Sequence, residues 1–265
     1  MTQETLTTAQ LAPQSCVMEA LQLAGRIIME NGGETYRVEE TVTRMGRAFG
    51  LDKVESFAVP SGVFVSYRRP DGGTETAVTR VHKGATNLKW VDEVNAISRR
   101  VEARELSPEE ALRQLRTIEQ EREPHEQVLL PIASAISGAG FAMMFGGGAA
   151  AMITAAVASA LSQLLTMFLA RRRLQALVGT LLGSLITALV PGVVARLLPL
   201  MLDVTVGGAL MPLLPGLAMT NAVQDTMRGD VLSGLCHGIS ALLTAGLIAC
   251  GTLLASGLTQ LGGAL

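Results

Sequence analysis

Residues 121–147 read EREPHEQVLLPIASAISGAGFAMMFGG, and they mark a sharp change in composition after Gln127. The first 127 residues hold 16 Lys or Arg and 20 Asp or Glu, whereas residues 128–265 hold five Arg, three Asp and neither Lys nor Glu. Uncharged stretches of about 20 residues are long enough to span the hydrocarbon core of a bilayer. A soluble helical bundle would instead need a polar face on each outer helix. The composition therefore predicts a soluble part up to Gln127 and a membrane part after it.

The uncharged, apolar stretches of the second part predict five membrane spans. They cover approximately residues 128–147, 149–170, 174–195, 198–222 and 231–257. The predicted fold class is thus an α+β N-terminal domain followed by an all-α polytopic membrane domain of about five transmembrane helices.

The arginines of the membrane part predict its orientation. Arg171, Arg172, Arg173 and Arg228 lie in predicted loops on the side of the N-terminal domain, and Arg196 lies on the other side. Positive loops usually face the cytoplasm. The polar N-terminus also lacks the basic start and apolar core of a secretory signal. We therefore expect a cytoplasmic N-terminal domain and a C-terminus on the opposite face of the membrane.

The soluble part is predicted to comprise a polar tail over residues 1–14 and a small α+β domain with a helical connector over residues 15–127, ahead of the membrane domain over residues 128–265. The run Pro70-Asp71-Gly72-Gly73 is a strong signal for a hairpin turn. The expected elements are helices over 15–31 and 35–49, strands over 54–59, 62–68 and 74–82, and helices over 86–104 and 108–121.

Prolines and glycines are predicted to interrupt the third and fourth membrane spans at Pro191-Gly192, Pro212 and Pro215-Gly216. Proline removes a backbone donor and clashes with the preceding turn. Broken helices that expose backbone groups to a ligand are typical of secondary transporters. A kink without any ligand contact is the alternative at each position.

Polar side chains are concentrated around the fourth and fifth predicted spans. Ionisable groups at membrane depth are costly and tend to mark ion or substrate pathways. Solvated loop charges are the alternative for Asp225 and Asp230, and a hydrogen-bonded packing role is the alternative for His237. The candidate pathway residues are Asp203, Pro215, Gly216, Asn221, Asp225, Asp230 and His237.

Nothing in the sequence indicates an enzyme. His82 and His125 have no Cys or Asp at metal-ligand spacing, and Ser61 has no Gly-x-Ser-x-Gly around it. The phosphate-binding pattern Gly-x-x-x-x-Gly-Lys is absent from the sequence. We expect no catalytic residues, cofactor, metal ion or nucleic-acid partner.

The run AGRIIMENGGETYRVE, residues 24–39, resembles the signature of the bacterial threonine/serine exporter family. Further matches are Pro60-Ser61-Gly62 before a strand and Arg80-Val81 at a strand end. In the membrane part, Leu214-Pro215-Gly216, Asn221-Ala222, Asp225 and Gly229-Asp230 also look familial. The resemblance extends over about residues 15–257.

The resemblance implies one half of a transporter. Families of this kind occur as a long single chain, or as two proteins of which the larger carries the soluble domain and about five spans. This chain is similar to that larger subunit, which works with a small all-membrane protein in pairs associated with succinate export. Fused forms are associated with threonine and serine export. The family places an arginine where this chain has His237, so substrate charge preference does not carry over at that position.

The leading hypothesis is an inner-membrane subunit of a secondary exporter for small carboxylate metabolites, coupled to protons and active as a hetero-oligomer in the lipid bilayer. Threonine, serine and succinate-like dicarboxylates are the expected substrates. Arg37 and Arg80 are candidates for contact with an anionic substrate, because guanidinium matches carboxylate geometry. A local charge network is the alternative for Arg37. The alternative function is a membrane-anchored sensor or enzyme whose N-terminal domain carries the activity.

Overall fold

The computed structural model describes residues 4–69, 71–82, 86–120, 126–172 and 174–261. The chain divides into two compact units. The first combines Met1–Arg122 with Leu217–Gly238, and the second combines Glu123–Gly216 with Ile239–Leu265. A segment from the predicted membrane part, Leu217–Gly238, therefore groups with the N-terminal domain.

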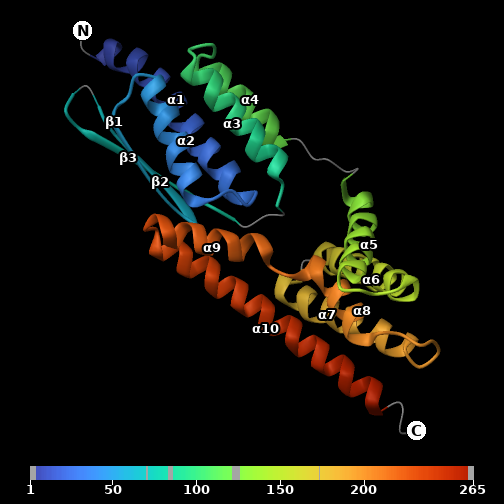
Figure 1. Cartoon of the computed structure of the whole chain (residues 1–265). Coiled ribbons are helices and arrows are strands. Elements are labelled where there is room, and N and C mark those ends of the chain that lie inside the picture. The colour runs from blue at the N-terminus through green and yellow to red at the C-terminus, as the bar shows by residue number, and fades with distance from the viewer. Residues whose placement is uncertain (1–3, 70, 83–85, 121–125, 173, 262–265) are drawn as a thin grey trace. The chain divides into compact units, whose positions relative to one another are not determined.

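The first unit contains the α+β domain that the sequence predicts. Its sheet has the antiparallel order β1-β2-β3, and Figure 1 shows α1 and α2 between this sheet and the helices α3 and α4. Helix α1 begins at Glu4, well before the predicted start at residue 15. The elements are α1 Glu4–Glu30, α2 Thr35–Ala48, β1 Asp52–Val59, β2 Gly62–Arg68, β3 Thr74–Arg80, α3 Leu88–Glu102 and α4 Pro108–Gln120.

One face of the sheet packs on the helices and the other carries exposed side chains. Val63, Val65 and Tyr67 alternate along β2 into the core, as the twofold period of a strand requires. Phe57 and Phe64 are cross-strand partners on the opposite face, where both are exposed. The hydrophobic core of this unit thus lies between the sheet and its helical layer.

The first unit also includes α9 Gly216–Arg228, from Leu217 onward, and the start of α10 Val231–Leu261. In α9, Asn221 and Asp225 are buried while Val223 and Met227 are exposed. The helix therefore directs its polar face inward and an apolar face outward, which is the reverse of a helix on a soluble protein.

The second unit is helical throughout its described residues. Small side chains bring its helices together: a Cβ on Gly208 of α8 would lie 2.5 Å from the backbone nitrogen of Ala142 in α5. Ser159 of α6 donates a hydrogen bond to the carbonyl of Ala209, also in α8, at 3.0 Å. The elements are α5 Glu126–Met144, α6 Ala149–Arg171, α7 Ala176–Val194, α8 Leu202–Leu210, the 3-10 turn η1 Met211–Leu213 and most of α10.

The expected count of five spans is confirmed only in part. Among the described residues, α6, α7 and α10 are long and apolar enough to cross a membrane, and a fourth span is counted if the broken pair α8–η1 and α9 forms one. The apolar part of α5, Leu129–Met144, is shorter than these helices. A break at Leu214-Pro215 separates η1 from α9, as predicted.

The predicted interruption at Pro191 is wrong. Helix α7 runs through Pro191 and ends at Val194. Pro191 lies near the end of the helix and its carbonyl still accepts a hydrogen bond from the amide of Ala195 at 2.8 Å. The missing proline donor therefore removes one bond without ending the helix.

Candidate functional site

The candidate site is a buried carboxylate on α9. Asp225 has no exposed surface, although it is an ionisable residue in an otherwise apolar part of the sequence. Its Oδ2 atom is 3.0 Å from Nδ1 of His237 and accepts a hydrogen bond from Thr35 Oγ1 at 3.3 Å. Its Oδ1 atom is buried and has no hydrogen-bond partner among the described residues. Such an arrangement is costly for a carboxylate unless its charge is compensated.

The turn between α9 and α10 places His237 opposite Asp225. Gly229 adopts φ +94°, and the amide of Asp230 donates to the carbonyl of Asp225 at 2.9 Å. This left-handed glycine ends α9 in the manner of a helix C-cap. A Cβ on Gly234 would lie 3.0 Å from the carbonyl oxygen of Ala222, so glycine permits the close approach of α10 to α9. Asp225 and His237, which are twelve positions apart in the sequence, therefore form a pair.

The loop between α1 and α2 positions Thr35, whose hydroxyl is a hydrogen-bond partner of Asp225 besides His237. Gly32 has φ +87°, and a Cβ on Gly33 would lie 2.4 Å from Ile28 Cγ2. Glycine at these positions lets the chain turn sharply, so that α2 starts at Thr35. Asn221 Nδ2 donates to the carbonyl of Gly32 at 3.4 Å. A carboxylate beside the first residue of a helix also gains from the helix dipole.

A second contact joins the start of α10 to the end of β1. Ser233 Oγ donates to the carbonyl of Ala58 at 3.5 Å, and the amide of Ala58 donates to Glu39 Oε1 at 2.9 Å. Burial raises the pKa of Glu39, and the negative charges of Asp230 and Asp225 raise it further, against the opposing effect of the Ala58 amide. Glu39 therefore lies within electrostatic reach of both Asp225 and Asp230.

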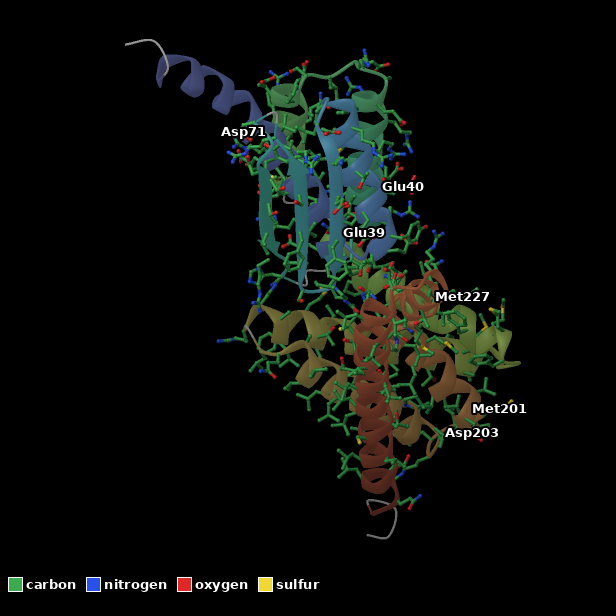
Figure 2. The ribbon with its side chains drawn as sticks, turned by 90° about the vertical axis from the view of Figure 1, so that its left-hand side faces the viewer. Glu39, Glu40, Asp71, Met201, Asp203 and Met227 are labelled. Atoms are coloured by element: carbon green, nitrogen blue, oxygen red, sulfur yellow. The ribbon has the colours of Figure 1, made fainter. Side chains whose placement is uncertain are left out.

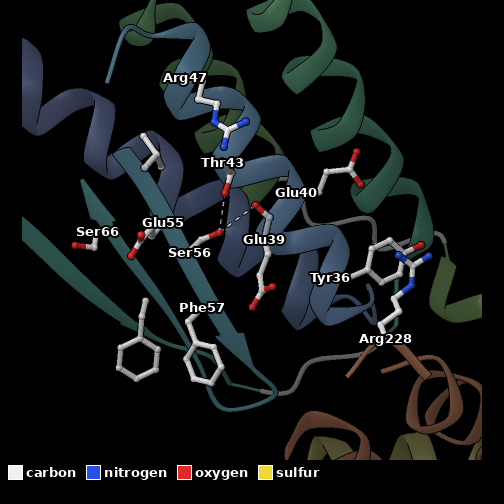
Figure 3. Close-up of a pocket in the computed structure, with 12 residues that line it drawn as sticks. Tyr36, Glu39, Glu40, Thr43, Arg47, Glu55, Ser56, Phe57, Ser66 and Arg228 are labelled. Atoms are coloured by element: carbon white, nitrogen blue, oxygen red, sulfur yellow. Dashed lines mark hydrogen bonds between the residues drawn. The ribbon is translucent and has the colours of Figure 1, made fainter. Parts of the chain in front are cut away.

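An open groove of about 780 Å³ lies on the outer side of α2, next to β1. Figure 3 shows Arg228 beside the ring of Tyr36 and the carboxylate of Glu39 directed along β1, whereas Glu40 points away. The Arg228 guanidinium lies 3.5 Å from the centroid of the Tyr36 ring, a cation–π contact. Thr43 and Ser56 hydroxyls are hydrogen-bonded at 3.1 Å within the groove. The groove offers both signs of charge, with the carboxylates of Glu39, Glu40 and Glu55 and the guanidiniums of Arg47 and Arg228.

The structure brings together three of the predicted pathway residues, Asn221, Asp225 and His237, with Asp230 near them. Asp203 lies exposed in the first turn of α8 in the second unit, where Figure 2 shows it near Met201. Pro215 lies at the break before α9, and Gly216 is the first residue of α9.

The two arginines predicted to contact substrate also lie apart from Asp225. Arg37 Nε donates to Glu34 Oε2 at 2.7 Å. Although burial acts in the opposite direction, this hydrogen bond lowers the pKa of Glu34. Arg80 is exposed at the end of β3. Arg37 and Glu34 thus form a local ion pair at the start of α2.

Sequence patterns alone do not identify Thr35 and Ser233 as members of this site. Thr35 belongs to the signature run, where it begins a predicted helix, and Ser233 is an uncharged residue in a predicted span. Their hydrogen bonds join residues that are 190 and 175 positions apart. The signal that pointed to Thr35 was the family signature itself. Within the described residues, no three His, Cys, Asp or Glu side chains form a group able to hold a metal ion.

Known proteins resemble this chain over most of its length. Residues 19–259 match the family model ThrE, described as "Putative threonine/serine exporter". A protein of Escherichia coli strain K12 named "Probable succinate transporter subunit YjjP" is 28% identical over 238 residues, covering 89% of this chain and 92% of that relative. A protein of the same name from Klebsiella aerogenes is 28% identical over 233 residues, covering 86% and 87%. No solved structure matches the chain. The family and both relatives are named as transporters rather than enzymes.

Proposed function

Because the chain belongs to the threonine/serine exporter family, we propose that it is one subunit of an inner-membrane secondary exporter of small carboxylate metabolites. The family description points to threonine and serine, and the relatives' name points to succinate. All three carry at least one carboxylate. The proposed complex pairs this chain with a smaller, all-membrane subunit.

The buried Asp225 is the observation that carries the proposal. A charged group within an apolar segment is retained at a free-energy cost, so such residues usually act in an ion or substrate pathway. Asp225 Oδ2 also lies 3.0 Å from Nδ1 of His237, so two ionisable side chains meet within this segment. Asn221 extends the polar group along the same helix. Asp203, Pro215 and Gly216 remain proposed pathway residues on the membrane side of the break.

A second subunit is supported by the relatives' name and by the outer faces of the helices. Both relatives are named as transporter subunits. Leu235, Ile239 and Leu242 expose an apolar strip on α10. These side chains have the positions and chemistry for contact with lipid or with another membrane subunit.

The proposed orientation places the N-terminal domain and Arg228 in the cytoplasm and the C-terminus in the periplasm or outside the cell. Arg171 ends α6, Arg172 follows it and Arg228 ends α9, as expected if the loops after these helices face the cytoplasm. Cysteine labelling from outside intact cells tests this orientation. A single cysteine in the last ten residues is expected to react, and one at exposed Asp71 is expected to be protected.

Reconstitution tests the function directly. Proteoliposomes loaded with radiolabelled succinate or threonine should show efflux only when this chain and a candidate small subunit are both present. Liposomes with either subunit alone serve as matched controls. Unchanged retention of succinate, threonine and serine by correctly assembled complexes would rule out the proposal.

A ligand sensor is the second candidate function, and the groove beside α2 is the observation that favours it. Its hydroxyls and charges are suited to a small polar ligand. A sensor should fail when Thr43 and Ser56 are both changed to alanine and should tolerate Asp225→Asn. The exporter should show the opposite pattern.

A further inference from the structure

We propose that Asp225 and His237 form a proton-binding site that holds the start of α2 against α9 and α10 while His237 is protonated. The inference rests on the proposed function, because it concerns the proposed pathway residue Asp225 and names the N-terminal domain as the part of the chain that responds to a proton bound there. We call the contacts of Asp225 with His237 and Thr35 the tether, and its strength is proposed to depend on one proton. Each contact of the tether lies within the first unit.

The pair has the geometry of a buried, charge-dependent contact. The His237 side chain is 14% exposed and the Asp225 side chain is fully buried, with 3.0 Å between Nδ1 and Oδ2. Histidine is the side chain that ordinarily titrates nearest to neutral pH. With a proton on both ring nitrogens, His237 compensates the charge of Asp225 through a charge-assisted hydrogen bond. Without that proton the charge-assisted hydrogen bond is lost, and Asp225 Oδ1 has no hydrogen-bond partner among the described residues that could take its place.

Other charged groups lie near the pair. Asp230, in the turn before α10, and Glu39, on α2, are electrostatically coupled to each other, and Glu39 is also coupled to Asp225. Of the other charged groups, Arg37 is occupied by Glu34, and Arg228 lies over the ring of Tyr36. The charged or titratable groups around Asp225 are thus Glu39 from α2, Asp230 from the turn and His237 from α10.

Thr35 connects the Asp225–His237 pair to the N-terminal domain. It is the first residue of α2, and its hydroxyl donates to the same Asp225 oxygen that His237 contacts. The carbonyl of Gly32, three residues earlier, accepts from Asn221 one turn away on α9. The loop from Asn31 to Thr35 is thus held at both ends by α9. Weakening the Asp225–His237 contact should loosen this loop first.

The length of α10 makes the site accessible from one side of the membrane. Its 31 residues extend about 46 Å at 1.5 Å per residue, whereas a hydrocarbon core is about 30 Å thick. About ten residues of α10 therefore extend beyond the core. His237 is the seventh residue of the helix, and residues up to Gly238 group with the N-terminal domain. With the N-terminal domain in the cytoplasm, as proposed above, and the additional residues of α10 at its N-terminal end, a proton from the cytoplasm reaches the pair without crossing the bilayer.

Hydrogen exchange of the full-length chain in lipid nanodiscs tests the proposal. Amides of residues 31–38 are followed by mass spectrometry at about pH 6 and pH 8, after correction for the intrinsic pH dependence of exchange. We expect exchange at pH 6 to be about tenfold slower, the size of one charge-assisted hydrogen bond. His237→Gln should abolish the difference. His237→Arg, which is charged at both pH values, should keep slow exchange throughout.

Three controls make the result decisive. His82→Gln removes an exposed histidine of the same unit and should preserve the pH difference. Unchanged exchange in α3 and α4 shows that each variant is folded. The proposal is overturned if residues 31–38 lack the pH difference, if His237→Gln retains it, or if sodium chloride in place of choline chloride at fixed pH produces the protection instead.

Failure of this site and failure of the proposed exporter can be distinguished. A pH-dependent loop in a complex that exports nothing supports the proton site and rejects the exporter. Export whose rate and pH profile are unchanged by His237→Gln, together with pH-independent exchange, rejects the proton site and leaves the exporter intact.

Discussion

The two units of this chain bury opposite kinds of side chain. In the N-terminal domain, large aliphatic residues such as Leu21, Ile28 and Val63 form the core. In the second unit the buried cluster consists of Ala142, Ala155, Ala158 and Ala209, while most large side chains are exposed. Water drives large apolar groups inward in the first case, whereas in a membrane small residues permit close helix contact and large ones face lipid. The difference identifies the solvent of each unit.

Residues Leu217–Gly238 follow neither pattern. They come from the apolar part of the sequence, yet they group with the N-terminal domain and bury Asn221, Asp225 and Ser233. Their contacts are hydrogen bonds to backbone and side chains of that domain. Polar contacts of this kind depend on precise geometry, because a buried polar group without a partner is costly.

The largest expected effect concerns the aliphatic core. Leu21→Ala should destabilise the N-terminal domain by about 2–5 kcal/mol, because Leu21 is fully buried and its removal leaves a cavity. Trp90 is the single tryptophan and packs against this core, so its fluorescence reports thermal unfolding of this unit. Leu253→Ala, at an exposed position on α10, is the matched control and should leave the transition unchanged.

An intermediate effect is expected where small residues permit helix contact. Gly208→Ala places a methyl group 2.5 Å from the backbone of Ala142, so α5 and α8 must separate, at about 1–3 kcal/mol. Gly246→Ala is the control, since its Cβ would have nothing within 4 Å. The temperature at which the purified chain loses its monodisperse elution peak should fall for Gly208→Ala alone. Equal behaviour of both variants would contradict close packing in the second unit.

The smallest effect concerns Glu39, which is electrostatically coupled to Asp225 and Asp230 of the segment Leu217–Gly238. The pKa of Glu39 is raised in the folded chain, so its protonated form favours folding. That contribution is present at acidic pH and is lost as pH rises through the folded pKa. Glu39→Gln should therefore stabilise the domain at neutral pH by less than about 1 kcal/mol. When unfolding is followed by Trp90 fluorescence, the stability of Glu39→Gln should depend less on pH than that of the wild type. Glu40→Gln, at an exposed position, should keep the wild-type pH dependence.

Local patterns predicted the elements of the N-terminal domain well. The turn residues Pro70 to Gly73 and the alternation around Val63 correctly indicated an antiparallel hairpin. Helix starts were less well defined: α1 begins before the predicted residue, because propensity does not identify a boundary within a polar stretch. The span count was confirmed only in part, since α5 has a shorter apolar stretch and Pro215 breaks the segment before α9.

The candidate site was predictable in its parts but not in its assembly. Composition singled out Asp225 and His237 because charges are rare in that part of the sequence. Their pairing depends on the turn at Gly229 and the close approach at Gly234, and the contact with Thr35 joins residues 190 positions apart. No local pattern encodes such long-range contacts.

Efflux from proteoliposomes that contain Asp225→Asn tests the central claim most directly. The variant removes the charge while keeping the size of the side chain, and Asp71→Asn, at an exposed turn labelled in Figure 2, is the matched control. With both subunits present and assembly verified, Asp225→Asn should reduce efflux at least about tenfold, corresponding to about 1.4 kcal/mol. Asp71→Asn should match the wild type. Full efflux by a correctly assembled Asp225→Asn complex would show that this carboxylate has no part in transport.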